Sequence, residues 1–146
     1  MTTTVDTDTL SQLSVTLRRI SRRIDRQVSV GGLTSTEASV LAFIARRGPL
    51  GLGELAAHEG INPTMLSRVI GRLEGAELVR RQPSIADRRA VEVVATRKGV
   101  RTRERLLTQR SQVLAERLAE LPPDMASLIM HAAPALEALS AALQPR

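Results

Sequence analysis

Arginine residues recur between residues 61 and 99, and they are the side chains best able to bind another molecule. Arg68 and Arg72 lie one turn apart in a predicted helix, and Arg88 and Arg89 lie in a predicted loop. Guanidinium groups bind phosphates and base edges through paired N–H donors. The candidate contact residues for a nucleic acid are Pro63, Thr64, Met65, Ser67, Arg68, Arg72, Asp87, Arg88 and Arg89.

The helix that carries Arg68 and Arg72 is predicted to begin at Pro63. Asn62 can accept a hydrogen bond from a first-turn amide, and proline is favoured at the first helical position. Ile61 and Leu66 have the spacing of a hydrophobic staple. The stripe expected to face the core consists of Leu66, Val69, Ile70 and Leu73. Taken alone, the opposite side of such a helix is more often a simple solvated surface. The neighbouring elements therefore determine whether it is interpreted as a binding surface.

Elements on both sides of this helix complete a helix-turn-helix with a basic hairpin. Residues 53–60 (GELAAHEG) predict a short helix ended by Gly60. Residues 78–82 and 90–95 are β-prone, and the segment 83–89 between them is too long for a two-residue turn. Arginine at a loop tip suits the narrow minor groove of DNA, and Asp87 could orient one arginine by a bidentate pair. The alternative for the tip alone is a solvated, charged turn.

The composition indicates one soluble domain. The chain has 146 residues, 42% of them hydrophobic, which suffices for a single core. Phe43 is its only aromatic residue, and it has no cysteine for disulfides or thiolate metal sites. No apolar run near 18 residues and no signal peptide is evident, so we expect a cytoplasmic protein without membrane partners.

Positive charge is concentrated in the candidate binding region. Residues 46–110 hold 14 Lys or Arg against 7 Asp or Glu, a net of +7, whereas residues 111–146 have a net of −2. Of the 21 cationic residues, 20 are arginine, which favours bidentate contacts with phosphates and bases. A basic stripe alone could also bind an anionic membrane surface, but no long basic amphipathic helix with large apolar anchors is evident, so double-stranded DNA is the predicted partner.

Enzymatic sites are not supported by the sequence. His58 and His131 are isolated from other metal-ligating residues, so we expect no metal, no cofactor and no catalytic residues. The serines lack a nucleophile motif, and the glycines form no phosphate loop. Glu74 and Glu77 are interpreted as a solvated pair at the end of a helix.

Apolar stripes in the terminal segments predict assembly. Residues 8–30 and 100–143 are expected to be dimerisation helices that flank a binding unit at 33–99. Their stripes include Leu10, Leu13, Leu17, Ile20 and Ile24 near the start, and Leu128, Leu136, Leu139 and Leu143 near the end. The two stripes together present more apolar surface than one small winged domain can bury. We therefore expect a homodimer; the alternative is a monomer in which they pack on each other.

The chain resembles the MarR family of transcriptional regulators. The resemblance rests on LGELA at 52–56, NPTMLSRVIGRLEGAELVRR at 62–81, DRR at 87–89 and TRKG at 96–99. It implies a mainly α fold with a small β wing: a winged helix-turn-helix plus N- and C-terminal dimerisation helices, within one domain at 1–146. It also implies that Arg89 enters the minor groove with Asp87 as its orienting partner. Gly53, where a capping Ser or Thr is usual, and Ala95, where Leu is common, depart from the pattern.

The resemblance also implies a small-molecule site beside the dimerisation helices. A small anionic or aromatic effector would then contact Leu17, Arg18, Phe43 and Arg46. The alternative is that Phe43 belongs to the core and the arginines are solvated. The presence of only one aromatic residue favours this alternative, because a stacking pocket for a planar ligand is then poorly supported.

The function expected from these observations is sequence-specific DNA binding. Two recognition helices about one turn of B-DNA apart, roughly 34–36 Å, would bind an inverted repeat and repress transcription. Two alternatives remain: an architectural DNA-binding protein with little sequence preference, and a winged-helix module for protein interaction.

Overall fold

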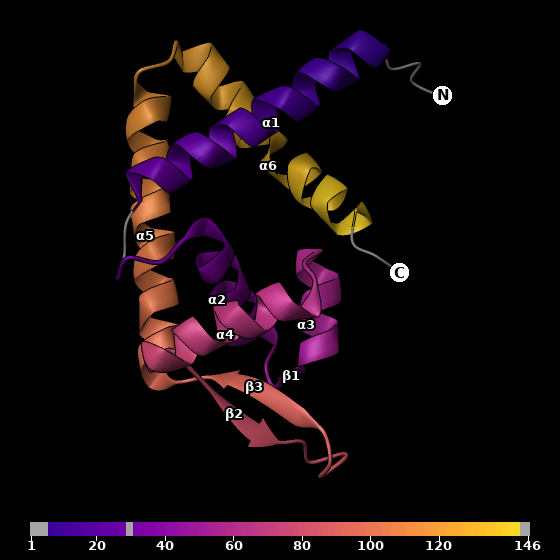
Figure 1. Ribbon diagram of the computed structural model, residues 1–146. Coiled ribbons are helices and arrows are strands. Elements are labelled where there is room, and N and C mark those ends of the chain that lie inside the picture. Colours follow the sequence, from indigo (N-terminus) through magenta and orange to yellow (C-terminus); the bar gives the residue numbers. More distant parts are fainter. Residues whose placement is uncertain (1–5, 29–30, 144–146) are drawn as a thin grey trace.

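The computed structural model describes residues 6–28 and 31–143, which form a winged unit with long helices above it (Figure 1). The helices of the described chain are α1 (Thr7–Gln27), α2 (Ser35–Arg47), α3 (Leu52–Glu59), α4 (Pro63–Gly75), α5 (Arg97–Ala119) and α6 (Pro123–Ala142). Its strands are β1 (Leu50–Gly51), β2 (Val79–Pro83) and β3 (Val91–Ala95). The expected mainly α fold with a small β wing is confirmed.

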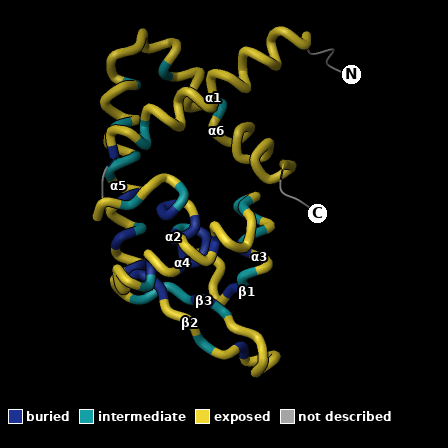
Figure 2. The backbone as a smooth tube through the Cα atoms, viewed as in Figure 1, coloured by how far each residue is buried: buried dark blue, intermediate teal, exposed yellow. Residues whose placement is uncertain are grey.

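The main core lies between α2, α3, α4 and the sheet, where Figure 2 shows the buried positions gathered. The four residues predicted as the inner stripe of α4 (Leu66, Val69, Ile70 and Leu73) are the ones that its helix buries. Leu41, Ile44 and Leu55 face them from α2 and α3 and are 0–1% exposed. Burial of such side chains contributes about 1.5–3 kcal/mol each, so this cluster fixes the orientation of α4.

The sheet has the order β1-β3-β2, and both pairings are antiparallel. β2 and β3 pair in register from Val79 opposite Ala95 to Pro83 opposite Val91. Val93 in the central strand is fully buried and also pairs with Leu50 of β1. The hairpin therefore projects from the core, and residues 85–90 of its loop lie in solvent at the lower end of Figure 1.

Threonine caps position α2 and α5. The sequence alone predicts both, because Thr34-Ser-Thr-Glu37 has the spacing of a capping box and Thr96 precedes the helix that follows the wing. The Thr34 side chain accepts from the Glu37 amide while the Glu37 carboxylate accepts from the Thr34 amide, which completes a capping box. Thr96 accepts from the Gly99 amide, and its hydroxyl donates to the Glu77 carbonyl at 2.6 Å. The first turn of α5 is thereby fixed to the turn that precedes the wing.

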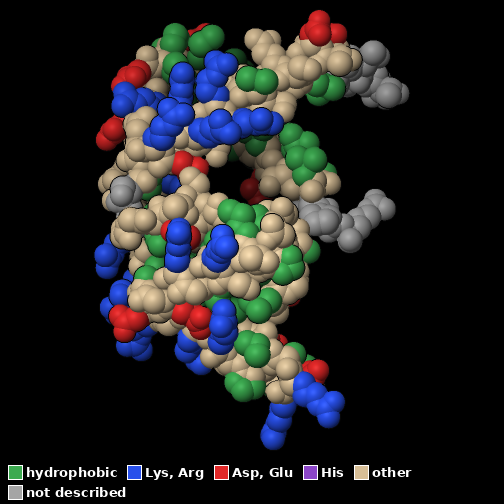
Figure 3. All heavy atoms as spheres, in the orientation of Figure 1, with side chains coloured by type: hydrophobic (Ala, Val, Ile, Leu, Met, Phe, Trp, Pro, Cys, Tyr) green, Lys and Arg blue, Asp and Glu red, His purple; other side chains and the backbone are tan. Residues whose placement is uncertain are grey.

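The terminal helices bury no side chain completely within the single chain. Leu10, Leu13 and Ile20 of α1 are 43–50% exposed, Leu128 of α6 is 69% exposed, and Leu143, which caps the end of α6, is 75% exposed. Figure 3 shows an opening between α1, α6 and the winged unit. Much of the apolar surface of the two stripes is therefore left exposed within the described chain.

Three expectations about individual segments are corrected by the structure. α6 is long and apolar enough to cross a membrane by length and composition, with a mean hydropathy of 1.2, although no such run was expected. Alanine and methionine raise its mean despite Asp124 and Glu137. Gly51 is the N-cap of α3, and Gly53 lies inside that helix. Glu77 lies beyond α4 at φ 61°, so it does not form a helix-end pair with Glu74.

Candidate nucleic-acid interface

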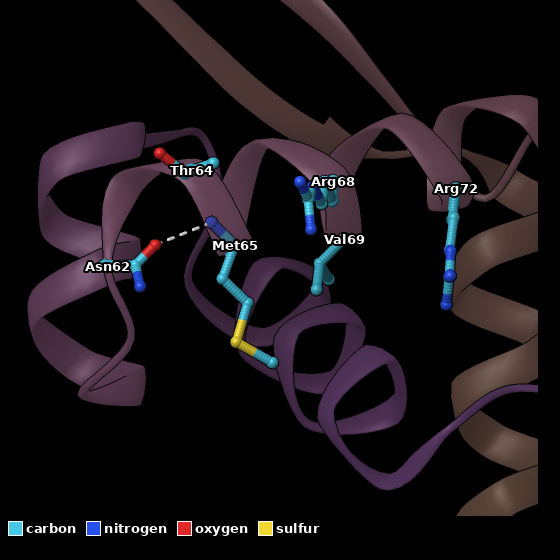
Figure 4. A pocket seen from close by; sticks show the side chains of 6 residues that line it. All are labelled: Asn62, Thr64, Met65, Arg68, Val69 and Arg72. Carbon is cyan, nitrogen blue, oxygen red and sulfur yellow. Dashed lines mark hydrogen bonds between the residues drawn. The ribbon is translucent and has the colours of Figure 1, made fainter.

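The exposed side of α4 is an open surface of polar and basic side chains. A hollow of about 490 Å³ is lined by Asn62, Thr64, Met65, Arg68, Val69 and Arg72 (Figure 4). Asn62 accepts from the Met65 amide at 2.8 Å, so the predicted cap sets the first turn. Pro63 occupies the first helical position, and Ser67 is exposed beside this hollow rather than lining it. The outer side of α4 is thus available to another molecule along its length.

Arg72 on this surface is held by a carboxylate from another helix. Its Nη1 donates to Glu37 Oε1 at 3.1 Å, and the Arg72 side chain remains 73% exposed while that of Glu37 is 6% exposed. The other carboxylate oxygen of Glu37 accepts from the Thr34 amide at 2.8 Å. One buried acid therefore caps α2 and orients an arginine of α4, whose remaining N–H donors stay free for an external acceptor.

Hydrogen bonding determines the charge state of Glu37. The Thr34 amide lowers the pKa of the Glu37 carboxyl most strongly, burial opposes this change, and the Arg72 guanidinium lowers the pKa further. The net effect is a pKa below the ordinary value of 4.5. Glu37 is therefore ionised at neutral pH, and its bond to Arg72 is charge-assisted.

The loop of the wing is built around a buried serine. Ser84 is 5% exposed, and its hydroxyl donates to Glu92 Oε1 at 2.6 Å and accepts from the Ala86 amide at 3.2 Å. Asp87 Oδ1 accepts from the backbone amide of Arg89 at 2.9 Å. The contact that the structure gives Asp87 is thus to the backbone and not to a guanidinium, because an Asx-type turn brings that amide within reach. Arg88 and Arg89 are both exposed at the tip.

Ion pairs join the wing to its neighbours. Arg81 Nε of β2 lies 3.6 Å from Glu74 Oε2 of α4, and Lys98 Nζ of α5 lies 3.2 Å from Glu77 Oε2. All four partners are partly or largely exposed, so each pair contributes little to stability. Their effect is geometric: they favour one orientation of the hairpin relative to α4. Arg81 is therefore less available than Arg88 or Arg89 to a partner.

Of the residues considered for a small-molecule site, the structure shows a contact only between Phe43 and Arg46. Phe43 is 8% exposed and stacks on His58 with ring centroids 3.6 Å apart. The Arg46 guanidinium lies 5.9 Å from the Phe43 ring centroid. Leu17 is exposed on α1, and the hollow that Arg18 lines is formed by other α1 residues. Phe43 is thus a core residue, as the alternative held.

Sequence reasoning missed the residues that position the site. Glu37 was interpreted only as part of a cap, and Ser84 was not considered. Their roles depend on partners 35 and 8 residues away. The sequence signal for Ser84 is weak, but a capping glutamate followed by a helix rich in arginine is a pattern that could have identified Glu37.

The helix, turn and second helix formed by α3 and α4, followed by the β2–β3 hairpin, define a winged helix-turn-helix protein. The model of the MarR family matches residues 33–91, which run from just before α2 through α3, α4 and β2 to the first residue of β3. The chain is 30% identical over 129 residues to an uncharacterised HTH-type transcriptional regulator of Mycobacterium bovis, Mb0904 (88% of this chain and 90% of that one). It is 25% identical to MdtR, an HTH-type transcriptional repressor of Bacillus subtilis (77% and 75%).

The fold agrees with these sequence relatives. The crystal structure of RV1404 from Mycobacterium tuberculosis superimposes with a TM-score of 0.74 at 27% identity, over 96% of this chain and 93% of that one. The chain belongs to the MarR family of transcriptional regulators. It is accordingly a DNA-binding protein and not an enzyme.

Proposed function

We propose that the protein is a homodimeric repressor that binds an inverted-repeat operator through α4 and the wing. Its residues 1–146 form one domain: a winged unit at about 33–99, flanked by dimerisation helices at about 8–30 and 100–143. The proposed contact residues are Pro63, Thr64, Met65, Ser67, Arg68, Arg72, Asp87, Arg88 and Arg89. A protein of this kind acts on chromosomal DNA, so we place it in the cytoplasm.

The observation that carries this proposal is the exposed arginine surface on a helix whose other side is rigidly buried. Arg68 and Arg72 lie one turn apart over the hollow on α4, whereas Leu66 and Ile70 beneath them are 0–1% exposed. An α-helix fits the major groove of B-DNA, where arginine distinguishes guanine by bidentate contacts. A fixed backbone allows the same side chains to meet the same base edges.

The exposed apolar stripes of α1 and α6 support the dimer. Two copies related by a two-fold axis can cover both stripes and present two α4 helices to successive major grooves. MdtR, named as a repressor, supports repression in this chain, since a dimer on a promoter excludes polymerase.

The proposal is tested by selecting bound duplexes from a random pool and then measuring binding to the selected site. We expect an inverted repeat, with Arg68→Ala relaxing the preference at one base pair by about 1–3 kcal/mol. Arg89→Ala should weaken binding at A·T-rich positions beside each half-site. Arg117→Ala on α5 lies outside α4 and the wing and serves as the control. It should leave the base-pair preference and the binding at A·T-rich positions unchanged.

The same selection separates the two other functions. An architectural DNA-binding protein would return no consensus, and a protein-interaction module would retain no duplex at low ionic strength. Either result would refute the repressor.

We also propose a small anionic or aromatic effector near Leu17, Arg18, Phe43 and Arg46. Its support is the cation of Arg46 beside the aromatic ring of Phe43. Such a ligand must displace His58 or use the ring edge, and it can act only by binding one dimer geometry more tightly than the other. Benzoate and salicylate are suitable probes: release of the operator by wild type but not by Arg46→Gln supports the site.

A further inference from the structure

Five arginines gather on one side of α1, outside the surface described above. Together they form what we call the α1 arginine face: Arg18, Arg19, Arg22, Arg23 and Arg26. All are exposed, and with Val15 they line a shallow hollow of about 310 Å³. At 3.6 residues per turn they fall within about 140° of the helix circumference and along about 12 Å of its axis. Figure 3 shows the basic side chains gathered over α1.

Contacts among the described residues do not neutralise this charge. The ion pairs found within residues 6–28 and 31–143 involve other cations, namely His58, Arg72, Arg81, Lys98, Arg110 and Arg117. Asp25, the acid nearest to the arginine face in sequence, bonds to Arg110 at 2.7 Å. Like charges one helical turn apart repel each other, so the face gains stability from a bound polyanion.

The arginine face lies opposite the apolar stripe of α1. Leu13, Leu17 and Ile20 occupy the other side of the helix circumference. In the proposed dimer that stripe is covered by the second copy, so the arginine face remains in solvent. Figure 3 shows it on the same side of the molecule as the basic side chains over α4.

We propose that the α1 arginine face binds the phosphate backbone of double-stranded DNA without sequence preference, as a second contact surface separate from α4 and the wing. Duplex DNA presents one charge per about 1.7 Å of axis, so 12 Å offers about seven phosphates to the five arginines. Binding through the backbone alone requires cations and no base contacts. The inference goes beyond operator recognition; it rests on the proposed dimer but not on binding to an operator.

Other polyanions suit this surface less well. Proteins that bind single strands or RNA loops stack bases on aromatic side chains, and the one aromatic residue of this chain, Phe43, is buried against His58. A helix that lies on an anionic membrane inserts its apolar side, which in α1 is assigned to the second copy. Duplex DNA is the polyanion whose backbone can be bound by exposed cations alone, which is what this side of α1 presents.

The test compares variants of the full-length protein in which arginines are replaced by uncharged glutamines. Arg18→Gln/Arg22→Gln removes two charges one turn apart on α1, and Arg101→Gln/Arg105→Gln removes two charges one turn apart on α5 as a matched control. A third variant changes all five α1 arginines to glutamine, which preserves helix propensity. Binding of a random-sequence duplex is titrated against salt, the molecular mass is measured by light scattering, and binding to vesicles of phosphatidylserine and phosphatidylcholine is measured in parallel.

We expect the five-fold variant to bind the random duplex at least about tenfold more weakly. The slope of log K against log salt should fall by about 3 per protomer if three phosphate contacts are lost. The α5 pair should leave the slope nearly unchanged, and the dimer mass and the relative preference for operator should persist. An unchanged slope, a monomeric variant, or loss of vesicle binding with DNA binding intact would each overturn the proposal. Preference for the operator is measured in a separate titration. Absence of that preference would contradict the proposed repressor function and not the proposed role of the α1 arginine face.

Discussion

Glu37 at the start of α2 holds Arg72 on the outer side of α4 at 3.1 Å, although the two residues are 35 positions apart. The acid is buried and the arginine is largely exposed. One end of this contact is therefore fixed by the capping box, while the other faces the proposed DNA surface. The pair restricts the directions in which the Arg72 guanidinium can donate, and in the proposed DNA complex this restriction should favour a particular base edge over any nearby phosphate.

Glu37→Gln should change specificity and general affinity in opposite directions. Affinity for random duplex should rise because one negative charge beside Arg72 is lost. Preference for the selected operator should fall about tenfold, since a good bidentate base contact contributes about 1–3 kcal/mol of discrimination. Both affinities are measured by fluorescence anisotropy at one salt concentration.

Glu116→Gln, an exposed acid on α5, is the control for the change in net charge. It should leave the operator preference unchanged. A parallel loss of operator and random binding in Glu37→Gln would mean that Glu37 supports only the fold.

The stabilisation contributed by Glu37 should be lost in acid. Its pKa in the folded protein is depressed below 4.5, with the Thr34 amide as the largest cause. A depressed pKa stabilises the folded state fully above the unfolded value, and the contribution disappears as pH falls through the folded value. The difference in unfolding free energy between wild type and Glu37→Gln should thus be constant from about pH 7 to 5 and shrink below 4.5. Urea titrations across this range measure it, and a pH-independent difference would contradict the assignment.

Ser84→Ala should loosen the wing without unfolding the protein. The substitution leaves the Ala86 amide and Glu92 carboxylate without their buried partner, which costs about 1–2 kcal/mol. Amide hydrogen exchange should accelerate at residues 84–90, and operator affinity should fall because the tip is less ordered. Ser111→Ala, an exposed position on α5, is the comparison. Unchanged exchange in the loop would refute a supporting role for Ser84.

Two glycines should respond oppositely to alanine. A Cβ on Gly99 would overlap the Leu78 carbonyl oxygen, so the start of α5 could not approach the wing turn as it does. Gly99→Ala should therefore destabilise the protein by about 2 kcal/mol or more. Gly71 lies inside α4 with open space around it, and Gly71→Ala should stabilise the helix by up to about 1 kcal/mol. Thermal unfolding distinguishes the two, and equal melting temperatures would contradict the packing at Gly99.

Local sequence signals predicted most of the fold. Asn62, Thr34 and Thr96 cap the helices assigned to them, because a cap is decided within three residues. The inner stripe of α4 was predicted correctly since helical periodicity and burial agree there. The start of α3 was placed one residue late because glycine at residue 51 provides no side-chain hydrogen bond to identify the cap.

The contacts that position the site could not be predicted in the same way. The Glu37–Arg72 bond and the Asp25–Arg110 bond join residues distant in sequence, and either acid has several arginines at comparable separation. The choice among them is made by packing of α2 on α4 and of α1 on α5. Phe43 was considered for a ligand because the family resemblance implies a site beside the dimerisation helices, whereas the stacking of His58 on its ring could be known only from the structure.

The base of the wing loop is closed by a hydrogen bond from the Ser84 amide to the Ala90 carbonyl at 2.9 Å. Between this hydrogen bond and the core, β2 and β3 pair in a fixed register, from Val79 opposite Ala95 to Pro83 opposite Val91. Residues 85–89 can therefore be exchanged for the tip of another family member without shifting either strand. In the proposed complex, a graft of this kind would transfer the groove preference of the wing without changing the base recognition proposed for α4.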